Sequence, residues 1–416
     1  MLAHALAAGR TLDPDRVVVV AGHGADRVTK AVARLEPDAA VVLQDRQLGT
    51  AHAVLQAAPV VTGGDVVVLY GDTPFLTPET LAQLVAARAR HDVVVLGFQA
   101  LDPGRYGRLI TSGDDLLAIV EWAEASAEER EIELCNSGVM CADAGVLFDL
   151  IGQVKNDNAK GEYYLTDVVG LARARGLSAG VVICDESETL GINTRAELAA
   201  AEAAFQARMR REALDNGVTM TAPDTVFFAL DTVLGRDAVI GPNVVFGPGV
   251  TVESEAEIKA FCHLEGCHIS RGAQVGPFAR LRPGAELAED VHVGNFVEIK
   301  NAILDEGVKV GHLTYLGDAH VGEFTNIGAG TVTCNYDGVM KHHTEIGANA
   351  FIGSDTMLVA PVTVGAGAMT ASGSVITGDV PDGALAVGRA RQVNKPGLAI
   401  RLMEKLRAIK AAKGKI

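Results

Sequence analysis

Residues 310–328 read VGHLTYLGDAHVGEFTNIG, and in this stretch an aliphatic residue followed by glycine returns after six residues. Val310-Gly311 is followed by Leu316-Gly317, and Val321-Gly322 is followed by Ile327-Gly328. An α-helix repeats its apolar face about every 3.6 residues and a strand every 2, so neither explains a period of six. A hexapeptide period is typical of a β-helix, in which each hexad forms one short strand and a turn.

The same rhythm extends from about Ile240 to about Val380, for example at Ile240-Gly241, Phe246-Gly247, Val275-Gly276, Val293-Gly294, Ile346-Gly347, Ile352-Gly353 and Val364-Gly365. A solenoid cannot bury its aliphatic face without stacked neighbours, so the repeat predicts a rigid, extended scaffold. A polar segment, TCNYDGVMKHHT (333–344), interrupts the rhythm and is expected to form a projecting loop.

The length and composition suggest two domains in a chain of 416 residues. Hydrophobic residues make up 48% and aromatic residues only 5%, which suits an aliphatic, glycine-rich core. The net charge of −16 argues against nucleic-acid or membrane-surface binding through long-range charge. The C-terminal segment is basic instead, and it is either a solvated tail helix or a docking site for a phosphorylated ligand.

Six cysteines form no CxxC pair, and the spacing of Cys262-His263 and Cys267-His268 fits no common zinc pattern. Small buried thiols in a reducing cytoplasm are the simpler interpretation. The first residues carry no positive segment typical of a signal peptide, and no apolar run approaches the ~18 residues of a spanning helix. The sequence therefore predicts a cytoplasmic protein with no membrane partner.

Residues 1–194 alternate short apolar strands with helical stretches, which favours an α/β domain with a parallel sheet. A long helix of strong helix formers is expected over 195–215, as a linker between domains. The solenoid is expected over 216–389 and the basic tail over 390–416. Strands are expected at Arg16–Ala21, Asp65–Tyr70 and Asp92–Gly97, and helices at Met1–Leu12, Asp26–Leu35, Ala51–Ala58 and Pro78–Arg90.

Several non-repetitive strings occur in one order along the chain. The first half contains QLGTAH (47–52), YGD (70–72), YGR (106–108), NSG (136–138), GEYYLTD (161–167) and GIN (191–193). The second half contains RLRPGA (280–285), NFVEIK (295–300), GHLTYLGD (311–318), NIGAGT (326–331) and CNYD (334–337). Together they closely resemble the bacterial bifunctional N-acetylglucosamine-1-phosphate uridylyltransferase / glucosamine-1-phosphate acetyltransferase family.

This resemblance implies a Rossmann-like nucleotidyltransferase domain followed by a left-handed parallel β-helix that assembles as a homotrimer. It implies acetyl transfer from acetyl-CoA to glucosamine-1-phosphate, and then uridylyl transfer from UTP to give UDP-N-acetylglucosamine for cell-wall synthesis. The family begins with a strand and a phosphate-binding loop of the type L-A-A-G-x-G-T-R-M, whereas Met1-Leu2-Ala3-His4 aligns only after that loop. We therefore expect the first strand to be missing, through a late start codon or a truncation, and uridylyl transfer to be weak or absent.

For acetyl transfer, the resemblance implies that His312 is the general base, a role that suits a side chain with an ordinary pKa of ~6.5. Arg282 and Lys300 supply the positive charge that a sugar phosphate needs. Tyr315 and Asn326 resemble further sugar contacts. The expected acetyl-CoA contacts are Ala329, Asn335, Tyr336, Ser354, Ser372 and Arg389, and Ser372 departs mildly from the alanine frequent in the family. The oxyanion donor is left open between a backbone amide and a side chain such as Ser354.

For uridylyl transfer, the resemblance implies that Asp72 and Asn193 bind Mg²⁺, for which oxygen ligands are apt. Gln44, Gly49 and Thr50 resemble the uracil-recognition set, next to Tyr70-Gly71-Asp72. Gly107, Glu121 and Asn136 resemble the sugar contacts. Two alternatives stay open: a non-catalytic trimeric scaffold, and a different sugar nucleotidyltransferase, such as a hexose-1-phosphate adenylyl- or guanylyltransferase, with a regulatory β-helix.

Overall fold

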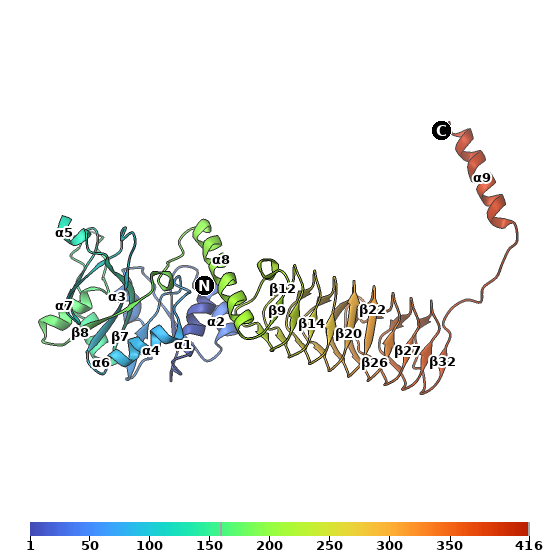
Figure 1. Cartoon of the computed structure of the whole chain (residues 1–416), viewed down its shortest axis with the longest axis horizontal. Coiled ribbons are helices and arrows are strands. Elements are labelled where there is room, and N and C mark those ends of the chain that lie inside the picture. Colours follow the sequence, from blue (N-terminus) through green and yellow to red (C-terminus); the bar gives the residue numbers. More distant parts are fainter. Residues whose placement is uncertain (159, 415–416) are drawn as a thin grey trace. The chain divides into compact units, whose positions relative to one another are not determined.

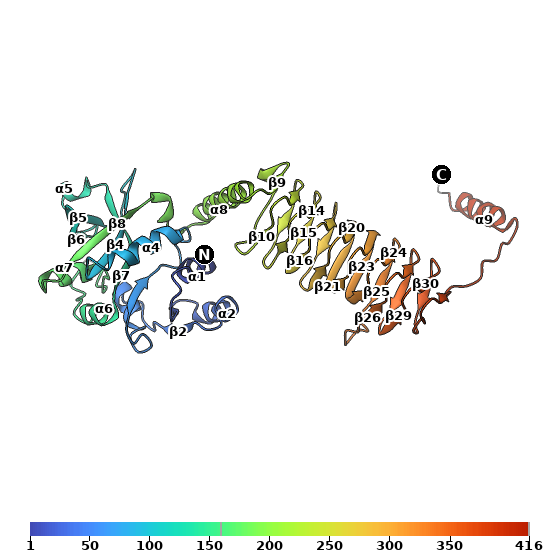
Figure 2. The ribbon, with the colours of Figure 1, turned by 60° about the horizontal axis from the view of Figure 1, so that its bottom comes forward.

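The computed structural model describes residues 1–158 and 160–414, which divide into two compact units, Met1–Phe205 and Gln206–Ile416 (Figure 1). In the described ranges, no helix combines the length and apolarity needed to cross a bilayer. The first unit is an α/β domain, and the second is a solenoid whose coils stack one on another, as Figure 2 shows from a second side.

The first unit contains a mixed sheet, which corrects the expectation of a parallel one. Its strands run in the order β3-β7-β4-β8-β6-β5, and β4 is parallel to β8 while β7 is antiparallel to both β3 and β4. These strands are β3 (Asp65–Val68), β4 (Val93–Gln99), β5 (Arg108–Ser112), β6 (Asp115–Val120), β7 (Leu134–Asp143) and β8 (Ala179–Cys184). Sequence patterning did not single out the long strand β7, because only part of it is a continuous apolar run.

A separate two-stranded parallel sheet, β1 (Val18–Ala21) and β2 (Ala40–Leu43), completes the strands of this unit. Four helices stay close to their expected bounds: α1 (Leu2–Arg10), α2 (Ala25–Leu35), α3 (Thr50–Leu55) and α4 (Pro78–Ala87). Three further helices were not expected from the sequence: α5 (Ala127–Arg130), α6 (Ala144–Ile151) and α7 (Asp167–Ala174). The central strand β4 is fully buried over Val93–Phe98, as a strand covered on both faces should be.

The solenoid forms parallel sheets in which each strand pairs with the strand one coil further on. One face is the ten-stranded sheet of β9 (Thr219–Met220), β11 (Val239–Ile240), β14 (Glu257–Ile258), β17 (Gln274–Val275), β20 (His292–Asn295), β22 (Lys309–His312), β24 (Asn326–Ile327), β27 (Phe351–Ile352), β30 (Met369–Thr370) and β32 (Leu385–Ala386). Val239 pairs with Glu257 and Glu257 with Gln274, so one coil takes 18 or 17 residues, or about three hexads.

The other two faces belong to one continuous sheet of fourteen strands: β10 (Val233–Leu234), β12 (Val245–Phe246), β13 (Thr251–Val252), β15 (His263–Leu264), β16 (Cys267–Ile269), β18 (Arg280–Leu281), β19 (Ala285–Leu287), β21 (Glu298–Leu304), β23 (Tyr315–Val321), β25 (Val332–Cys334), β26 (Thr344–Ile346), β28 (Met357–Val359), β29 (Val362–Val364) and β31 (Val375–Ile376). The aliphatic residue of each hexad points inward; Ile240, Ile258, Val275 and Val293 are fully buried in one column.

A long helix, α8 (Arg195–Asp215), enters the solenoid. Its Gln206 is 2% exposed, donates from Nε2 to the Phe228 carbonyl at 2.8 Å, and accepts from the Phe228 N–H at 2.9 Å. Met209 and Ala213, one and two turns further on, pack against the apolar core of the first coils. The second half of α8 therefore covers the open end of the stack at its start.

The glycine of the hexad is required where coils approach closely. A methyl group on Gly294 would lie 1.9 Å from the carbonyl oxygen of Gly311 in the next coil, whereas one on Gly311 would meet nothing within 4 Å. We predict that Gly294→Ala lowers the free energy of unfolding by about 1–3 kcal/mol, as overpacking typically does. Gly311→Ala is the matched control and should stay near the parent in denaturant unfolding. Equal stability of the two variants would contradict the stacking geometry.

Candidate functional site

His312 is the last residue of β22 and lies exposed at a corner of the solenoid. Its Nδ1 lies 2.5 Å from Oδ1 of Asn295, its register partner in the preceding coil. The chain turns directly after it, at Leu313, which takes a left-handed φ of 51°. A groove of about 420 Å³ opens beside the imidazole and is lined by Lys259, Gly276, Pro277, Phe278, His292, Gly294, Asn295, Phe296, Gly311 and His312.

Four of the six expected acetyl-CoA contacts follow His312 along the same edge, and the other two, Asn335 and Tyr336, do not. Backbone hydrogen bonds connect Gly330 to His312, Asp355 to Ala329, and Gly373 to Ser354. Ala329, Ser354 and Ser372 therefore lie in a row on successive coils, which begins one coil after His312. Arg389 lies near its far end, with Cδ 3.9 Å from where a Cβ of Gly373 would be. Asn326 precedes Ala329 by three residues and lies on strand β24, where it pairs in register with Lys309 and Phe351.

The expected sugar-phosphate contacts lie on the adjoining face, beyond the corner. Arg282 donates to Oε1 of Glu298 at 2.8 Å, and Lys300 pairs in register with Gly317. Lys300 also meets Lys341, and this contact, reinforced by burial, lowers the pKa of the Lys300 ammonium. Two ammonium groups so close together favour an anion between them.

Arg282, Lys300 and Lys341 form a group of positive charges that we call the cationic cluster, and Asp318 and Asn335 lie beside it. Burial works to raise the pKa of Asp318, but hydrogen bonds from Asn301, at 2.7 Å, and from Asn335 hold it below its ordinary value. The Tyr315 hydroxyl and the Asn335 amide nitrogen lie over Gly317, where a methyl group would approach them to 2.3 and 2.8 Å. The structure thus brings Lys300, Tyr315 and Asn335 together.

Sequence reasoning missed Lys341, Asn295 and Asp318. Lys341 belongs to the segment expected to project as a loop, where the solenoid period gives no information on what a side chain meets. Tyr336, on the same loop, is 60% exposed and pairs with Lys341 in an isolated bridge. Asn295 and Asp318 lie within the quoted strings NFVEIK and GHLTYLGD, and that adjacency was the available signal.

In the α/β unit, the expected uracil contacts surround the start of α3. Gln44 donates from Nε2 to the Gly49 carbonyl at 3.1 Å, and Thr50 accepts from the Leu165 N–H at 3.0 Å. Gly49 has a φ of 112°, and a methyl group there would lie 2.5 Å from the Tyr163 carbonyl, so only glycine fits. Burial raises the pKa of Tyr70, which meets Thr50, to about 12.

Two of the three expected sugar contacts of this unit meet, and the third, Glu121, is bonded to Thr166. The Asn136 N–H donates to the Gly107 carbonyl at 2.8 Å, and the Thr166 hydroxyl donates to Oε1 of Glu121 at 3.1 Å. The pKa of Asp167, next to Thr166, is raised by burial and by the carboxylates of Glu124 and Glu121.

Asp72 and Asn193, the expected Mg²⁺ ligands, are brought near each other by a backbone hydrogen bond from Ile192 to the Asp72 carbonyl at 3.1 Å. Gly71, between Tyr70 and Asp72, has open space where a side chain would begin. Within the described ranges, no group of three His, Cys, Asp or Glu is arranged to hold a metal alone. One carboxylate and one amide oxygen fit Mg²⁺, which usually keeps several waters and shares substrate phosphates.

Two family models match this chain, one in each unit. Residues 1–133 match the MobA-like NTP transferase domain, and residues 343–378 match the bacterial transferase hexapeptide (six repeats). With its parallel sheets, the second unit is a left-handed β-helix. The bifunctional protein GlmU of Cereibacter sphaeroides is 75% identical over 100% of this chain and 92% of its own length. That of Paracoccus denitrificans is 71% identical over 98% and 91%. The structure of HddC from Yersinia pseudotuberculosis complexed with GMP-PN covers 49% of this chain and 84% of its own at 15% identity, but its TM-score of 0.38 is too low to support an argument.

The loop that carries Lys341 is held by Asp337. Its carboxylate accepts from His342 Nε2 at 2.7 Å and from the N–H groups of Met340 and Val339 at 2.7 and 2.8 Å, and these bonds lower the pKa of Asp337 to about 2. Because this value lies below the ordinary one of about 4, the bonds stabilise the loop above about pH 4 and are lost as pH falls towards 2.

We predict that hydrogen-exchange protection of the Met340 amide falls between about pH 4 and 2, ahead of the Val293 amide in the core. Asp337→Asn should remove most of that protection already at neutral pH, whereas the exposed control Glu323→Gln should not. A Met340 amide equally protected in the parent and in Asp337→Asn would show that the carboxylate does not hold the loop.

Proposed function

Since this chain belongs to the family of the bifunctional protein GlmU, a transferase with a nucleotidyltransferase unit and a hexapeptide-repeat acyltransferase unit, we propose that the solenoid transfers the acetyl group of acetyl-CoA to the amine of glucosamine-1-phosphate. The observation that carries this proposal is the position of His312, exposed beside a groove and hydrogen-bonded through Nδ1 to Asn295.

The Asn295 contact selects the tautomer of His312. When the amide oxygen accepts a hydrogen bond from Nδ1–H, Nε2 is left unprotonated and can act as a base. Nε2 then takes a proton from the substrate amine as its nitrogen bonds to the acetyl carbonyl carbon. The carbon–sulfur bond of the thioester breaks, and the coenzyme A thiolate leaves and takes up a proton. An amide neighbour, unlike a carboxylate, orients the imidazole without adding a negative charge beside it.

The cationic cluster would hold the sugar phosphate. Arg282, Lys300 and Lys341 concentrate positive charge on one face of a chain whose net charge is −16. Arg282 offers a planar fork for two phosphate oxygens, whereas the two lysines act as point charges. Tyr315 and Asn326 would contact the sugar, and Asn335, Tyr336, Ala329, Ser354, Ser372 and Arg389 the acetyl-CoA.

The two groups of residues lie on different faces of one chain, and this supports a site shared between copies. His312 ends a strand of the ten-stranded sheet, whereas Lys300 and Tyr315 lie on the fourteen-stranded sheet beyond the corner at Leu313. We propose that a homotrimer, the assembly that the family resemblance implies, brings the His312 edge of one copy against the cationic face of the next in a closed ring.

A row of phenylalanines next to His312 is a further argument for association. Phe261, Phe278 and Phe296 stack with ring centroids 4.9 and 5.3 Å apart, yet are 51%, 45% and 55% exposed. All three have φ near 60°, a conformation that costs an L-residue about 1–2 kcal/mol. Exposed aromatic side chains held at such positions suit an interface that covers them.

The α/β unit would transfer the uridylyl group of UTP to N-acetylglucosamine-1-phosphate and give UDP-N-acetylglucosamine, in the cytoplasm. Asp72 and Asn193 would hold Mg²⁺, which neutralises charge on the reacting phosphates when bound. Gln44, Gly49 and Thr50 would receive the base, and Gly107, Glu121 and Asn136 the sugar.

We predict that His312→Ala lowers the rate of coenzyme A release with glucosamine-1-phosphate by the 10²–10⁴ typical of a general base. A thiol-reactive dye measures this rate. His263→Ala, on a strand several coils away, is the matched control and should keep the parent rate. Near-parental turnover of His312→Ala would contradict the assignment of His312 as the general base.

For a polypeptide of these 416 residues we predict weak uridylyl transfer, since a preorganised phosphate clamp is worth several kcal/mol and residues 1–194 contain lysine only at 30, 155 and 160. Pyrophosphate release from UTP and N-acetylglucosamine-1-phosphate, with and without Mg²⁺, measures it, with acetyl transfer by the same sample as the control. Turnover of uridylyl transfer at the 1–10³ s⁻¹ typical of enzymes would refute the prediction.

A further inference from the structure

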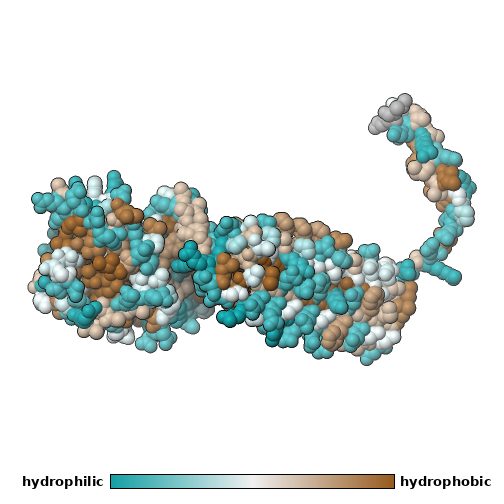
Figure 3. All heavy atoms as spheres, in the orientation of Figure 1, coloured by the Kyte–Doolittle hydropathy of each residue, from teal (hydrophilic) through white to brown (hydrophobic). Residues whose placement is uncertain are grey.

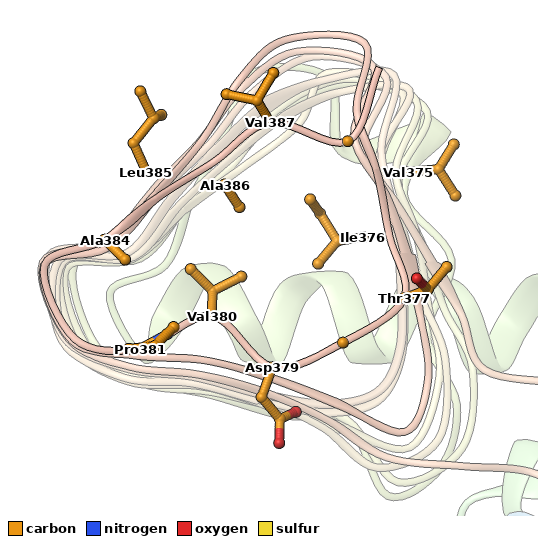
Figure 4. A pocket seen from close by; sticks show the side chains of 12 residues that line it. Val375, Ile376, Thr377, Asp379, Val380, Pro381, Ala384, Leu385, Ala386 and Val387 are labelled. Carbon is orange, nitrogen blue, oxygen red and sulfur yellow. The ribbon is translucent and has the colours of Figure 1, made fainter. Parts of the chain in front are cut away.

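The two ends of the solenoid differ in their cover. At the first coils, Met209 and Ala213 of α8 pack against the apolar core. At the last coil, a hollow of about 220 Å³ remains, into which Ile376, Val380 and Ala386 point (Figure 4). A solenoid needs a cap at each end, because the terminal coil has no neighbour to cover its aliphatic interior.

The rim of this hollow is apolar and exposed. Leu385 and Val387 are 62% and 61% exposed and point away from the coil, while Ala384 and Ala386 are half-buried. Asp379 and Asp382 lie exposed on the same coil, where each accepts a backbone N–H of the preceding coil. The end of the stack is thus an apolar surface with two carboxylates beside it.

The helix that follows, α9 (Leu398–Ala412), has the complementary surface. Leu402, Leu406 and Ile409 share one side of the helix at spacings of four and three, and they are 51%, 59% and 43% exposed. The remaining sides carry Arg401, Lys405, Arg407 and Lys410 against the single acid Glu404, together with the apolar residues Ile400 and Met403. Figure 3 shows brown and teal residues alternating along this helix. An apolar stripe left in water on an ordered helix calls for a partner.

We propose that α9 docks on the end of its own solenoid as a cap, with its apolar stripe on the hollow and its cations towards Asp379 and Asp382. Length permits this. A helix of 15 residues is about 22 Å long, close to the ~20 Å side of a coil formed by one extended hexad. The segment 387–397 can reach about 36 Å when extended, which is enough to turn α9 back over the last coil.

Docking would also place Arg389, a consequence that rests on the proposed acetyl-CoA site. Arg389 lies in the segment between the last strand and α9, beside the row of Ser354 and Ser372. Fixing α9 on the end coil would shorten the free length of this segment and hold the guanidinium near the row.

Two variants, each with one cysteine added to the six native ones, test the docking without any assay of activity. Leu406→Cys places a thiol on the stripe, and Ile400→Cys places one on the opposite side of α9 at a residue that is 66% exposed. We expect a maleimide to alkylate Leu406→Cys at least about tenfold more slowly, because the cap must open first. The six native cysteines are counted by mass spectrometry in the parent. Equal rates for the two variants would overturn the proposal.

Two variants with two added cysteines each identify the surface on which α9 docks and show whether that surface belongs to the same chain. Ala384→Cys combined with Leu406→Cys should be joined by a short bis-maleimide within one chain, and Ala384→Cys with Ile400→Cys should not. A product of two chains would mean that α9 caps a second copy, which overturns docking on its own solenoid. Protection of Leu406→Cys without cross-linking to residue 384 would place the stripe on another surface and equally overturn the proposal.

Discussion

The register of coil on coil is the constraint on which the rest of this structure depends. Each strand of the solenoid pairs with the strand one turn later, and buried aliphatic residues such as Val293 and Val310 stack in columns between them. At Gly294 a Cβ would collide with the Gly311 carbonyl of the next coil, so the two coils are packed at the closest distance that their backbones allow. Because the coils cannot slip, residues about 17 apart in sequence are held side by side.

The proposed chemistry follows from that register. Asn295 lies one coil before His312 and can therefore set the proton on its imidazole. Lys300 lies one coil before Gly317, with the Tyr315 hydroxyl and the Asn335 amide over that glycine. A row of contacts for a long ligand such as coenzyme A arises in the same way, since each coil adds one position to an edge. Residues one coil apart in the sequence, such as Asn295 and His312, therefore become neighbours on the surface of the solenoid.

The sequence predicts more of the solenoid than of the α/β unit. The hexads indicate the coils, because an inward aliphatic residue and a small residue at the turn are needed in each one. The mixed sheet was not predicted, because alternating strands and helices do not reveal that β7 runs antiparallel to β4. The partners of Lys300 were missed for a different reason. Lys341 lies 41 residues later in a loop of the solenoid, and periodicity says nothing about where loop side chains fold back.

His312 and Lys300 lie on different faces of one chain, separated by the corner at Leu313. The proposed acetyl-transfer site therefore depends on two copies of the chain, one supplying His312 and the other Lys300. Mixing two chains, each inactive in acetyl transfer, tests it directly. His312→Ala and Lys300→Ala chains, denatured together and refolded at equal amounts, should regain about one quarter of the parental activity, because about that share of interfaces combines an intact His312 edge with an intact cationic face. Each variant refolded alone should stay inactive. A mixture no more active than the separate variants would show that both residues serve one site within a single chain, contrary to this account.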